Sequence, residues 1–287
     1  MNSHSKTIQY SYIKESWNRL RSKKLPMLGL YILIILILCS IFIPFFTSLT
    51  YYETNLSMKN TPPNINEFFG TDDLGRSVFS RIWSGARISL FVGITAAIID
   101  MIIGVIYGSF AALSGGRIEE IMMRIADTFH SLPYLLMVIL LTVVMGQGIV
   151  TIILAITLTG WINMARIIRA ETLRLKEQDF VQAALSLGAS TKRILFAHII
   201  PNCFGTILTT VTLTIPTAIF TESFLSFLGL GVQAPIASWG TMASNGLASL
   251  TYYPWRLFFP AIFISITMLA FNLLGNGLRD AFDPRFR

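Results

Sequence analysis

The segment MLGLYILIILILCSIFIPFF, residues 27–46, carries no charged side chain over twenty positions. At about 1.5 Å per residue, a helix of this length spans roughly 30 Å, the thickness of the hydrocarbon core of a bilayer. The run is longer than the ~7–15 apolar residues of a signal peptide, and no small-residue cleavage site follows it before Tyr51. We therefore predict a retained transmembrane helix.

The composition extends this interpretation to the rest of the 287 residues. The chain is 53% hydrophobic and only 13% charged, with a mean hydropathy of +0.64, whereas a soluble domain has about 25% charged residues. Further apolar stretches lie near residues 88–112, 132–146, 149–168, 203–228 and 257–276. The predicted fold is therefore all-α and polytopic, with six transmembrane helices.

The basic residues are distributed unevenly between these predicted helices. With the N-terminus in the cytoplasm, 17 Lys and Arg residues fall on cytoplasmic segments and only five on the opposite side. This asymmetry is the positive-inside pattern, and it predicts that both termini are cytoplasmic. Because membrane orientation explains the net charge of +7, we predict a lipid bilayer and no nucleic acid as a partner.

The predicted helices divide the chain into five parts. These are a cytoplasmic N-terminal tail (1–26), the first transmembrane helix (27–47), an extracytoplasmic loop (48–87), a main transmembrane domain (88–276) and a cytoplasmic C-terminal tail (277–287).

One cytoplasmic stretch of the main domain is too long for a simple turn. Residues 178–201 read QDFVQAALSLGASTKRILFAHIIP, with apolar positions that fit an amphipathic helix. Gly188 suits the end of this helix, Ser190 or Thr191 suits the start of a second one, and Pro201 precedes the next span. The segment is thus predicted to form a surface for another protein or, alternatively, an amphipathic helix lying on the bilayer.

The same segment carries a family motif. Its pattern Gln182-Ala183-Ala184-x3-Gly188-x9-His198-x-Ile200-Pro201 resembles the EAA loop of ABC importer membrane subunits, with Gln in place of the usual Glu. The resemblance implies a coupling helix that seats on a separate ATPase. The positions implied for coupling are Gln182, Ala183, Ala184, Gly188, Ala189 and Pro201.

Four other stretches narrow the resemblance. Residues 69–76 (FGTDDLGR), 222–233 (ESFLSFLGLGVQ), 238–240 (SWG) and 277–285 (GLRDAFDPR) resemble the C-type permease subunit of dipeptide, oligopeptide and nickel ABC importers. This resemblance implies a type I ABC importer transmembrane fold in a bacterial inner membrane. It also implies a B-type second permease, one or two ATPase subunits and an extracytoplasmic solute-binding protein. The implied cargo is a di- or oligopeptide, with nickel or a metal chelate as the alternative.

Two carboxylates fall inside predicted helices, where each costs about 2.5–3.5 kcal/mol on insertion scales. Asp100 is expected to face the bundle interior, to be protonated or to pair with a polar neighbour such as Asn163. Alternatively, Asp100, Asn163 and Glu222 line the translocation pathway, where Glu222 forms a gate; the other role for Glu222 is packing between helices. Gly104 and Gly108 form a GxxxG face that predicts close helix packing.

Pro216 lies in the middle of the predicted fifth helix, where it leaves a backbone carbonyl without its donor. We expect Thr212 or Thr214 to help satisfy the freed backbone groups.

Motifs for catalysis are absent from the sequence. It contains no G-x4-G-K-[ST] phosphate loop, HExxH, G-x-S-x-G or Cys/His zinc spacing. We therefore predict no catalytic residue, no metal site and no bound cofactor, with ATP and Mg²⁺ used by the partner ATPase. The rival classes are a gated channel and an intramembrane enzyme.

Overall fold

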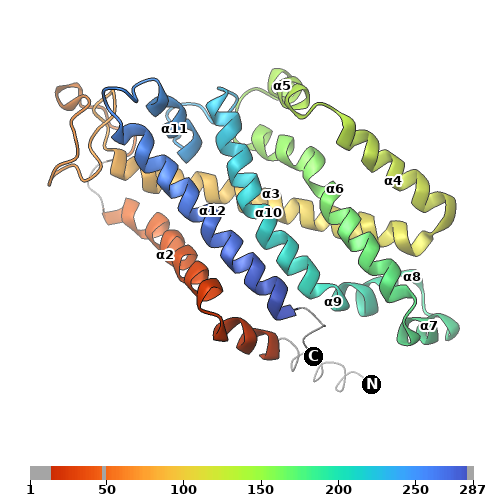
Figure 1. Cartoon of the computed structure of the whole chain (residues 1–287). Coiled ribbons are helices and arrows are strands. Elements are labelled where there is room, and N and C mark those ends of the chain that lie inside the picture. The colour runs from red at the N-terminus through yellow and green to blue at the C-terminus, as the bar shows by residue number, and fades with distance from the viewer. Residues whose placement is uncertain (1–13, 47–49, 283–287) are drawn as a thin grey trace.

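The computed structural model describes residues 14–46 and 50–282 as helices and connecting loops, without an extended strand in these ranges. Five helices are long and apolar enough to cross a membrane (Figure 1). They are α2 (Lys24–Phe46), α3 (Val78–Ser114), α6 (Ile149–Lys176), α10 (Phe204–Phe227) and α12 (Trp255–Phe282). The predicted all-α, polytopic fold is confirmed.

A bent pair of shorter helices is apolar enough to count as a sixth crossing if the two helices form one span. Helices α4 (Gly116–Ser131) and α5 (Tyr134–Met145) meet at an angle of 82°. The bend lies at Pro133, which disfavours helical backbone in the residue before it. The sequence predicted a loop over 113–130 followed by one span over 132–146, and this prediction differs from the bent helix pair. The twelve residues of α5 cover only about 18 Å, and most of the expected loop is helix α4.

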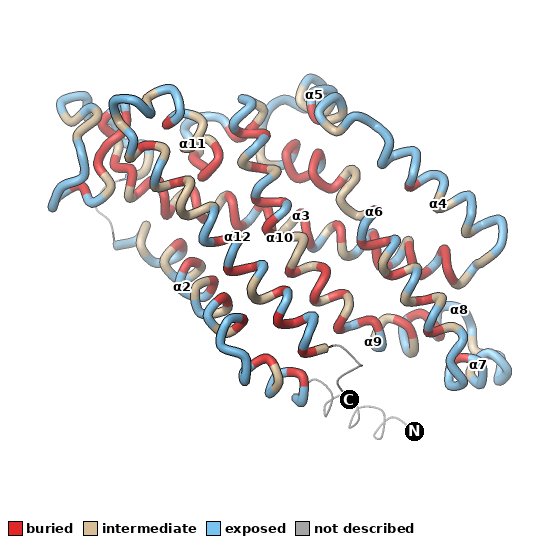
Figure 2. The backbone as a smooth tube through the Cα atoms, in the orientation of Figure 1, coloured by how far each residue is buried: buried red, intermediate tan, exposed pale blue. Residues whose placement is uncertain are grey.

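Close contact between α3 and α6 builds the centre of the bundle. A Cβ atom on Gly104 would lie 2.6 Å from the Cβ of Met164, and one on Gly108 would overlap the backbone of Ala165. Only glycine permits this approach, so the predicted packing role of the GxxxG face is confirmed. Figure 2 shows buried positions concentrated along α3, α6 and α10, whereas α4 is largely exposed.

The described ends of the chain lie together at one end of the bundle. Lys23 Nζ and Asp280 Oδ2 are 2.7 Å apart, and a Cβ on Gly277 would overlap the ring of Pro26. Helix α12 continues to Phe282, past the predicted end at residue 276. Residues 1–13 and 283–287 of the two predicted tails lie outside the described part.

The opposite end is formed by a loop and two short helices, η1 (Leu56–Met58) and α11 (Trp239–Leu247). Helix α3 begins at Val78, ten residues earlier than the predicted span. The Asp72 carboxylate accepts a 2.7 Å hydrogen bond from Arg76 Nε and lies 3.5 Å from Arg81 Nε. The Arg76 pair closes the loop on itself, and the Arg81 pair fastens it to the first turn of α3, which was predicted to be part of a longer loop.

Candidate functional site

The segment that links α6 to α10 forms a helix, a turn and a second helical stretch, as predicted. It comprises α7 (Asp179–Ser186), α8 (Thr191–Ile194), the π-helical turn η2 (Leu195–Ile199) and α9 (Ile200–Asn202). We call residues 178–203 the linking segment.

Gly188 ends the first helix in the predicted way. Its φ of +76° lies in the left-handed region that favours glycine. The Gly188 N–H donates to Leu185 O at 2.9 Å and the Ala189 N–H to Ala184 O at 3.0 Å, the paired closure of a Schellman motif. Ser190 then caps α8 by accepting a hydrogen bond from Arg193 N.

The inner face of the linking segment is anchored and its outer face is open. Val181 and Ile194 are buried against Ile168 of α6. Leu187, which the helical pattern placed on the apolar face, is 88% exposed. A Cβ on Gly188 would meet no atom within 4 Å. An apolar surface of this kind, held firmly and left uncovered, is suited to docking.

The other predicted coupling residues lie around this surface. Gln182 and Ala183 are exposed, and Ala184 and Ala189 are partly exposed. The Gln182 side chain donates to Lys176 O at 2.8 Å, so it also ties α7 back to α6. Pro201 stands apart, half-buried at the start of α9.

Cys203 closes the linking segment on its buried side. It is fully buried in the cluster that contains Val181 and Ile194. Burial raises the pKa of the Cys203 thiol to about 12, with the nearby Glu171 carboxylate acting in the same direction and Arg174 opposing it. The thiol is therefore neutral and behaves as a small apolar group.

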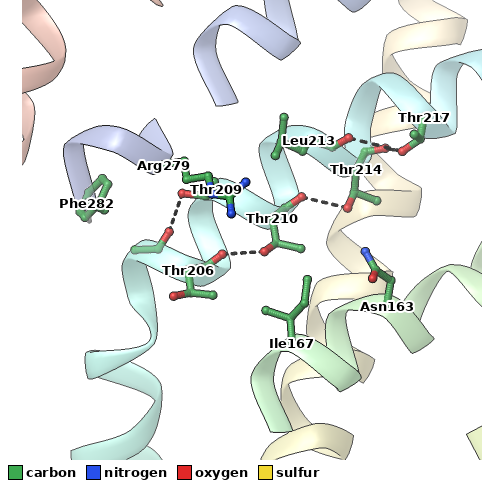
Figure 3. Close-up of a pocket in the computed structure, with 11 residues that line it drawn as sticks. Asn163, Ile167, Thr206, Thr209, Thr210, Leu213, Thr214, Thr217, Arg279 and Phe282 are labelled. Atoms are coloured by element: carbon green, nitrogen blue, oxygen red, sulfur yellow. Dashed lines mark hydrogen bonds between the residues drawn. The ribbon is translucent and has the colours of Figure 1, made fainter. Parts of the chain in front are cut away.

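A polar cleft runs along α10 on the side that faces α6. It contains a cavity of about 530 Å³ between α6, α10 and the end of α12, and an adjoining cavity of about 300 Å³. Figure 3 shows Thr210 and Thr214 of α10 on the side of Ile167 and Asn163 of α6, with Thr209 beside Arg279. Asn163, Thr214 and Thr217 line both cavities.

Asp100 lines the smaller cavity. Asp100 is only 2% exposed, and neither of its carboxylate oxygens has a hydrogen-bond partner in the described part of the chain. Gly160 provides the room, because a Cβ there would overlap the carboxylate. The expected hydrogen bond from Asn163 is wrong. Asn163 lines the same cavity but donates no hydrogen bond to either oxygen of Asp100.

Glu222, the other membrane carboxylate, is enclosed by hydroxyl donors. It is fully buried and accepts hydrogen bonds from Ser89 Oγ at 3.1 Å and Ser226 Oγ at 2.9 Å. Ser89 in turn accepts a bond from Trp239 N at 3.2 Å. Glu222 thus joins α3, α10 and α11, and it lines neither of the two cavities.

The threonines around Pro216 do not act as predicted. A proline at 216 leaves Thr212 O without its helical donor. The Thr212 and Thr214 hydroxyls donate to Leu208 O and Thr210 O, both at 2.8–2.9 Å. The prediction that one of these hydroxyls bonds a backbone group freed by Pro216 is therefore wrong, because each hydroxyl donates to the carbonyl one turn before its own residue.

Sequence reasoning missed most of the cavity lining. Tyr134, Arg279 and the α10 threonines were not predicted to line a cavity. A usable signal was present in the recurrence of Thr206, Thr210, Thr214, Thr217 and Thr221 at intervals of three or four residues, which places hydroxyls on one helix face. Tyr134 had no such signal, because the bend before α5 brings it to the cavity.

Comparison with known proteins identifies relatives along most of the chain. Residues 100–287 match the family model described as "Binding-protein-dependent transport system inner membrane component", and residues 11–63 match "N-terminal TM domain of oligopeptide transport permease C". The oligopeptide transport system permease protein OppC of Bacillus subtilis is 60% identical over 96% of this chain and 90% of its own length. The dipeptide transport system permease protein DppC of the same organism is 54% identical over 96% and 87%.

A solved structure shares the fold. A chain of the MetNI methionine ABC transporter in an inward-facing conformation superposes with a TM-score of 0.57 and 15% identity, covering 69% of this chain and 94% of that one. The bundle with its polar cleft and exposed linking segment is the architecture of a membrane-embedded transport subunit. The chain belongs to the family of binding-protein-dependent transport system inner membrane components, which are non-catalytic permease subunits of ABC importers.

Proposed function

We propose that this chain is one of two homologous permease subunits that together enclose the pathway of an ATP-driven importer for di- and oligopeptides. The second permease is of the B type, one or two ATPase subunits bind on the cytoplasmic side, and a solute-binding protein delivers cargo from outside. This chain binds no cofactor or metal and has no catalytic residue, and the ATPase subunits use the ATP and Mg²⁺.

The observation that carries this proposal is the surface around Gly188. It is anchored through Val181 and Ile194 yet left uncovered, with Leu187 projecting from it. A rigid apolar protrusion fits a groove on an ATPase and transmits its movement directly to α6 and α10. Gln182, Ala183, Ala184 and Ala189 complete the docking surface. Pro201 belongs instead to the joint with α10.

The orientation follows from the charges. The N-terminal tail, residues 113–130, residues 165–202 and the C-terminal tail together carry 17 of the 22 Lys and Arg residues, which favours the cytoplasmic side for the linking segment. Cargo would then pass along the cleft lined by Asp100 and Asn163. We assign Glu222 to packing, because its oxygens are already occupied by serine hydroxyls.

The peptide cargo is supported by the relatives, whose names specify oligopeptide and dipeptide transport. Reconstitution tests it. The chain is inserted into liposomes with its second permease, ATPase subunits and binding protein, and uptake of radiolabelled trialanine and of ⁶³Ni²⁺ is measured with and without ATP.

We expect ATP-dependent uptake of trialanine that requires every subunit, and no ATP-dependent uptake of the metal. Nickel uptake in place of peptide uptake would favour the metal alternative. Peptide flux without ATP or ATPase subunits would indicate a channel, and a chemically altered peptide would indicate an enzyme.

A further inference from the structure

The Asp100 carboxylate is buried in the membrane-spanning bundle without a donor. Both of its oxygens lack a hydrogen-bond partner among the described residues, whereas Glu222 has its hydroxyl donors. A buried ionised carboxylate without a partner is strongly disfavoured, so such a group either takes up a proton or pairs with a cation. A cation that enters the cavity of about 300 Å³ would meet Asp100, because Asp100 lines that cavity.

The α10 threonine hydroxyls of this cavity offer acceptors rather than donors, and Asn163 and Tyr134, which also line it, can each accept as well as donate. Three threonines that line it donate their hydroxyl protons to the backbone of α10: Thr214 to Thr210 O at 2.9 Å, Thr217 to Thr214 O at 2.6 Å and Thr221 to Thr217 O at 2.8 Å. Each of these oxygens therefore presents only lone pairs to the cavity. The Tyr134 hydroxyl is buried on the same cavity and also lacks a partner in the described part.

Acceptor oxygens beside an unpaired carboxylate suit a cation that carries only donors. A primary ammonium group has three N–H donors and no acceptor, and it forms charge-assisted bonds with a carboxylate. A bare metal ion fits less well. Within the described residues no three His, Cys, Asp or Glu side chains converge, and the cavity holds the volume of about ten water molecules.

We propose that this cavity binds the α-ammonium group of a passing peptide, with Asp100 as its counter-ion and the oxygens of Tyr134, Thr214 and Thr217 as its remaining acceptors. The proposal rests on the proposed peptide transport and adds a chemical requirement to it. The permease chain itself, and not only the binding protein, then distinguishes a free amino terminus from a blocked one.

The test measures binding in the permease complex without the binding protein, so that delivery does not bias the result. A cysteine reporter is placed by Thr159→Cys, a half-buried position that lines the cavity, in a chain carrying Cys39→Ser and Cys203→Ala. Its rate of modification by N-ethylmaleimide is measured with trialanine or with N-acetyl-trialanine. A Leu56→Cys reporter, which lies on η1 outside the cavity lining and is 68% exposed, detects effects on the reagent itself.

Trialanine should slow modification of the Thr159→Cys reporter at a concentration about tenfold lower than its acetylated form, the difference expected for loss of one charge-assisted contact. Asp100→Asn should remove this difference. Asp127→Asn, which neutralises an exposed carboxylate paired with Arg166 at 2.7 Å, should retain it. Neither peptide should alter the rate at the Leu56→Cys reporter.

Equal protection by the two peptides would overturn the proposal, and that comparison needs no change at Asp100. A preference that persists in Asp100→Asn would overturn it as well, as would protection by NaCl alone at matched ionic strength. ATP-driven uptake of trialanine by the full importer is measured in parallel. If uptake is absent while the ammonium preference is present, the proposed function fails and the cation site stands.

Discussion

Where α3 crosses α6, a Cβ atom on Gly108 would overlap the backbone of Ala165, whereas no atom lies within 4 Å of the corresponding position on Gly188. The first glycine is needed for contact between two helices. The second is needed for a φ of +76° at the end of α7. The space at the crossing is filled by atoms of this chain, whereas the outer face of the linking segment is open to a partner protein.

This difference shows how the molecule separates stability from function. Filled regions, such as the α3–α6 crossing and the serine cluster around Glu222, hold the bundle together. Open regions, such as the surface around Gly188 and the cavity beside Asp100, leave groups exposed or unpaired. Substitutions in filled regions should therefore change folding, and substitutions in open regions should change binding and transport.

The largest effect is expected for Gly108→Leu. The leucine side chain would occupy the position of the Ala165 backbone and force α3 away from α6, which should destabilise the protein by at least about 3 kcal/mol. Thermal melting and folded yield of the purified protein measure this. Gly148→Leu is the control, because Gly148 has extended backbone and open space around it. Equal stability of the two variants would contradict the packing described for the crossing.

The two membrane carboxylates should respond in opposite ways. Glu222→Ala leaves the Ser89 and Ser226 hydroxyls unpaired and a gap between helices, so we expect a loss of about 3 kcal/mol. Asp100→Asn removes a charge that has no donor, and it should change stability by less than about 1 kcal/mol or increase it. Melting temperatures of the two variants give the comparison. A larger loss for Asp100→Asn would reverse the assignment of filled and open sites.

The sequence predicted the features that depend on local chemistry. The uncharged 27–46 run, the GxxxG contact and the turn at Gly188 follow from composition, residue size and backbone freedom, and the structure confirms them. The bend between α4 and α5 and the cavity partners of Asp100 depend on how helices distant in sequence are placed. Pattern alone therefore suggested Asn163 as a bonded neighbour and left Tyr134 unnoticed.

A smaller effect, confined to binding, is expected for Leu187→Asp. Because Leu187 is almost fully exposed, the fold and its melting temperature should not change. A charge in the centre of an apolar docking surface should weaken binding of the ATPase subunits by about ten- to a hundredfold. Leu56→Asp is a matched control, since Leu56 is 68% exposed on η1 at the other end of the bundle. Unchanged ATPase affinity would show that the surface around Leu187 is not used.

The mildest test leaves the fold intact and concerns Cys203. Because its pKa is raised to about 12 by burial, the reactive thiolate becomes more abundant by about tenfold per pH unit up to about pH 12. In a Cys39→Ser chain, the slow reaction with N-ethylmaleimide should therefore keep accelerating from pH 7 to pH 10. Mass spectrometry of the adduct follows it. A rate that levels off near pH 9, as for an ordinary thiol, would show that this side of the linking segment is open.

The most direct test of the linking segment as the contact for the ATPase compares Gly188→Leu with Gly146→Leu. Both glycines have φ near +77° and no atom within 4 Å of an added Cβ, so the local strain is matched. They lie at opposite ends of the bundle. ATPase binding and ATP-driven trialanine uptake should fall at least about tenfold for Gly188→Leu and be little changed for Gly146→Leu. Equal behaviour of the two variants would contradict a coupling role for this segment.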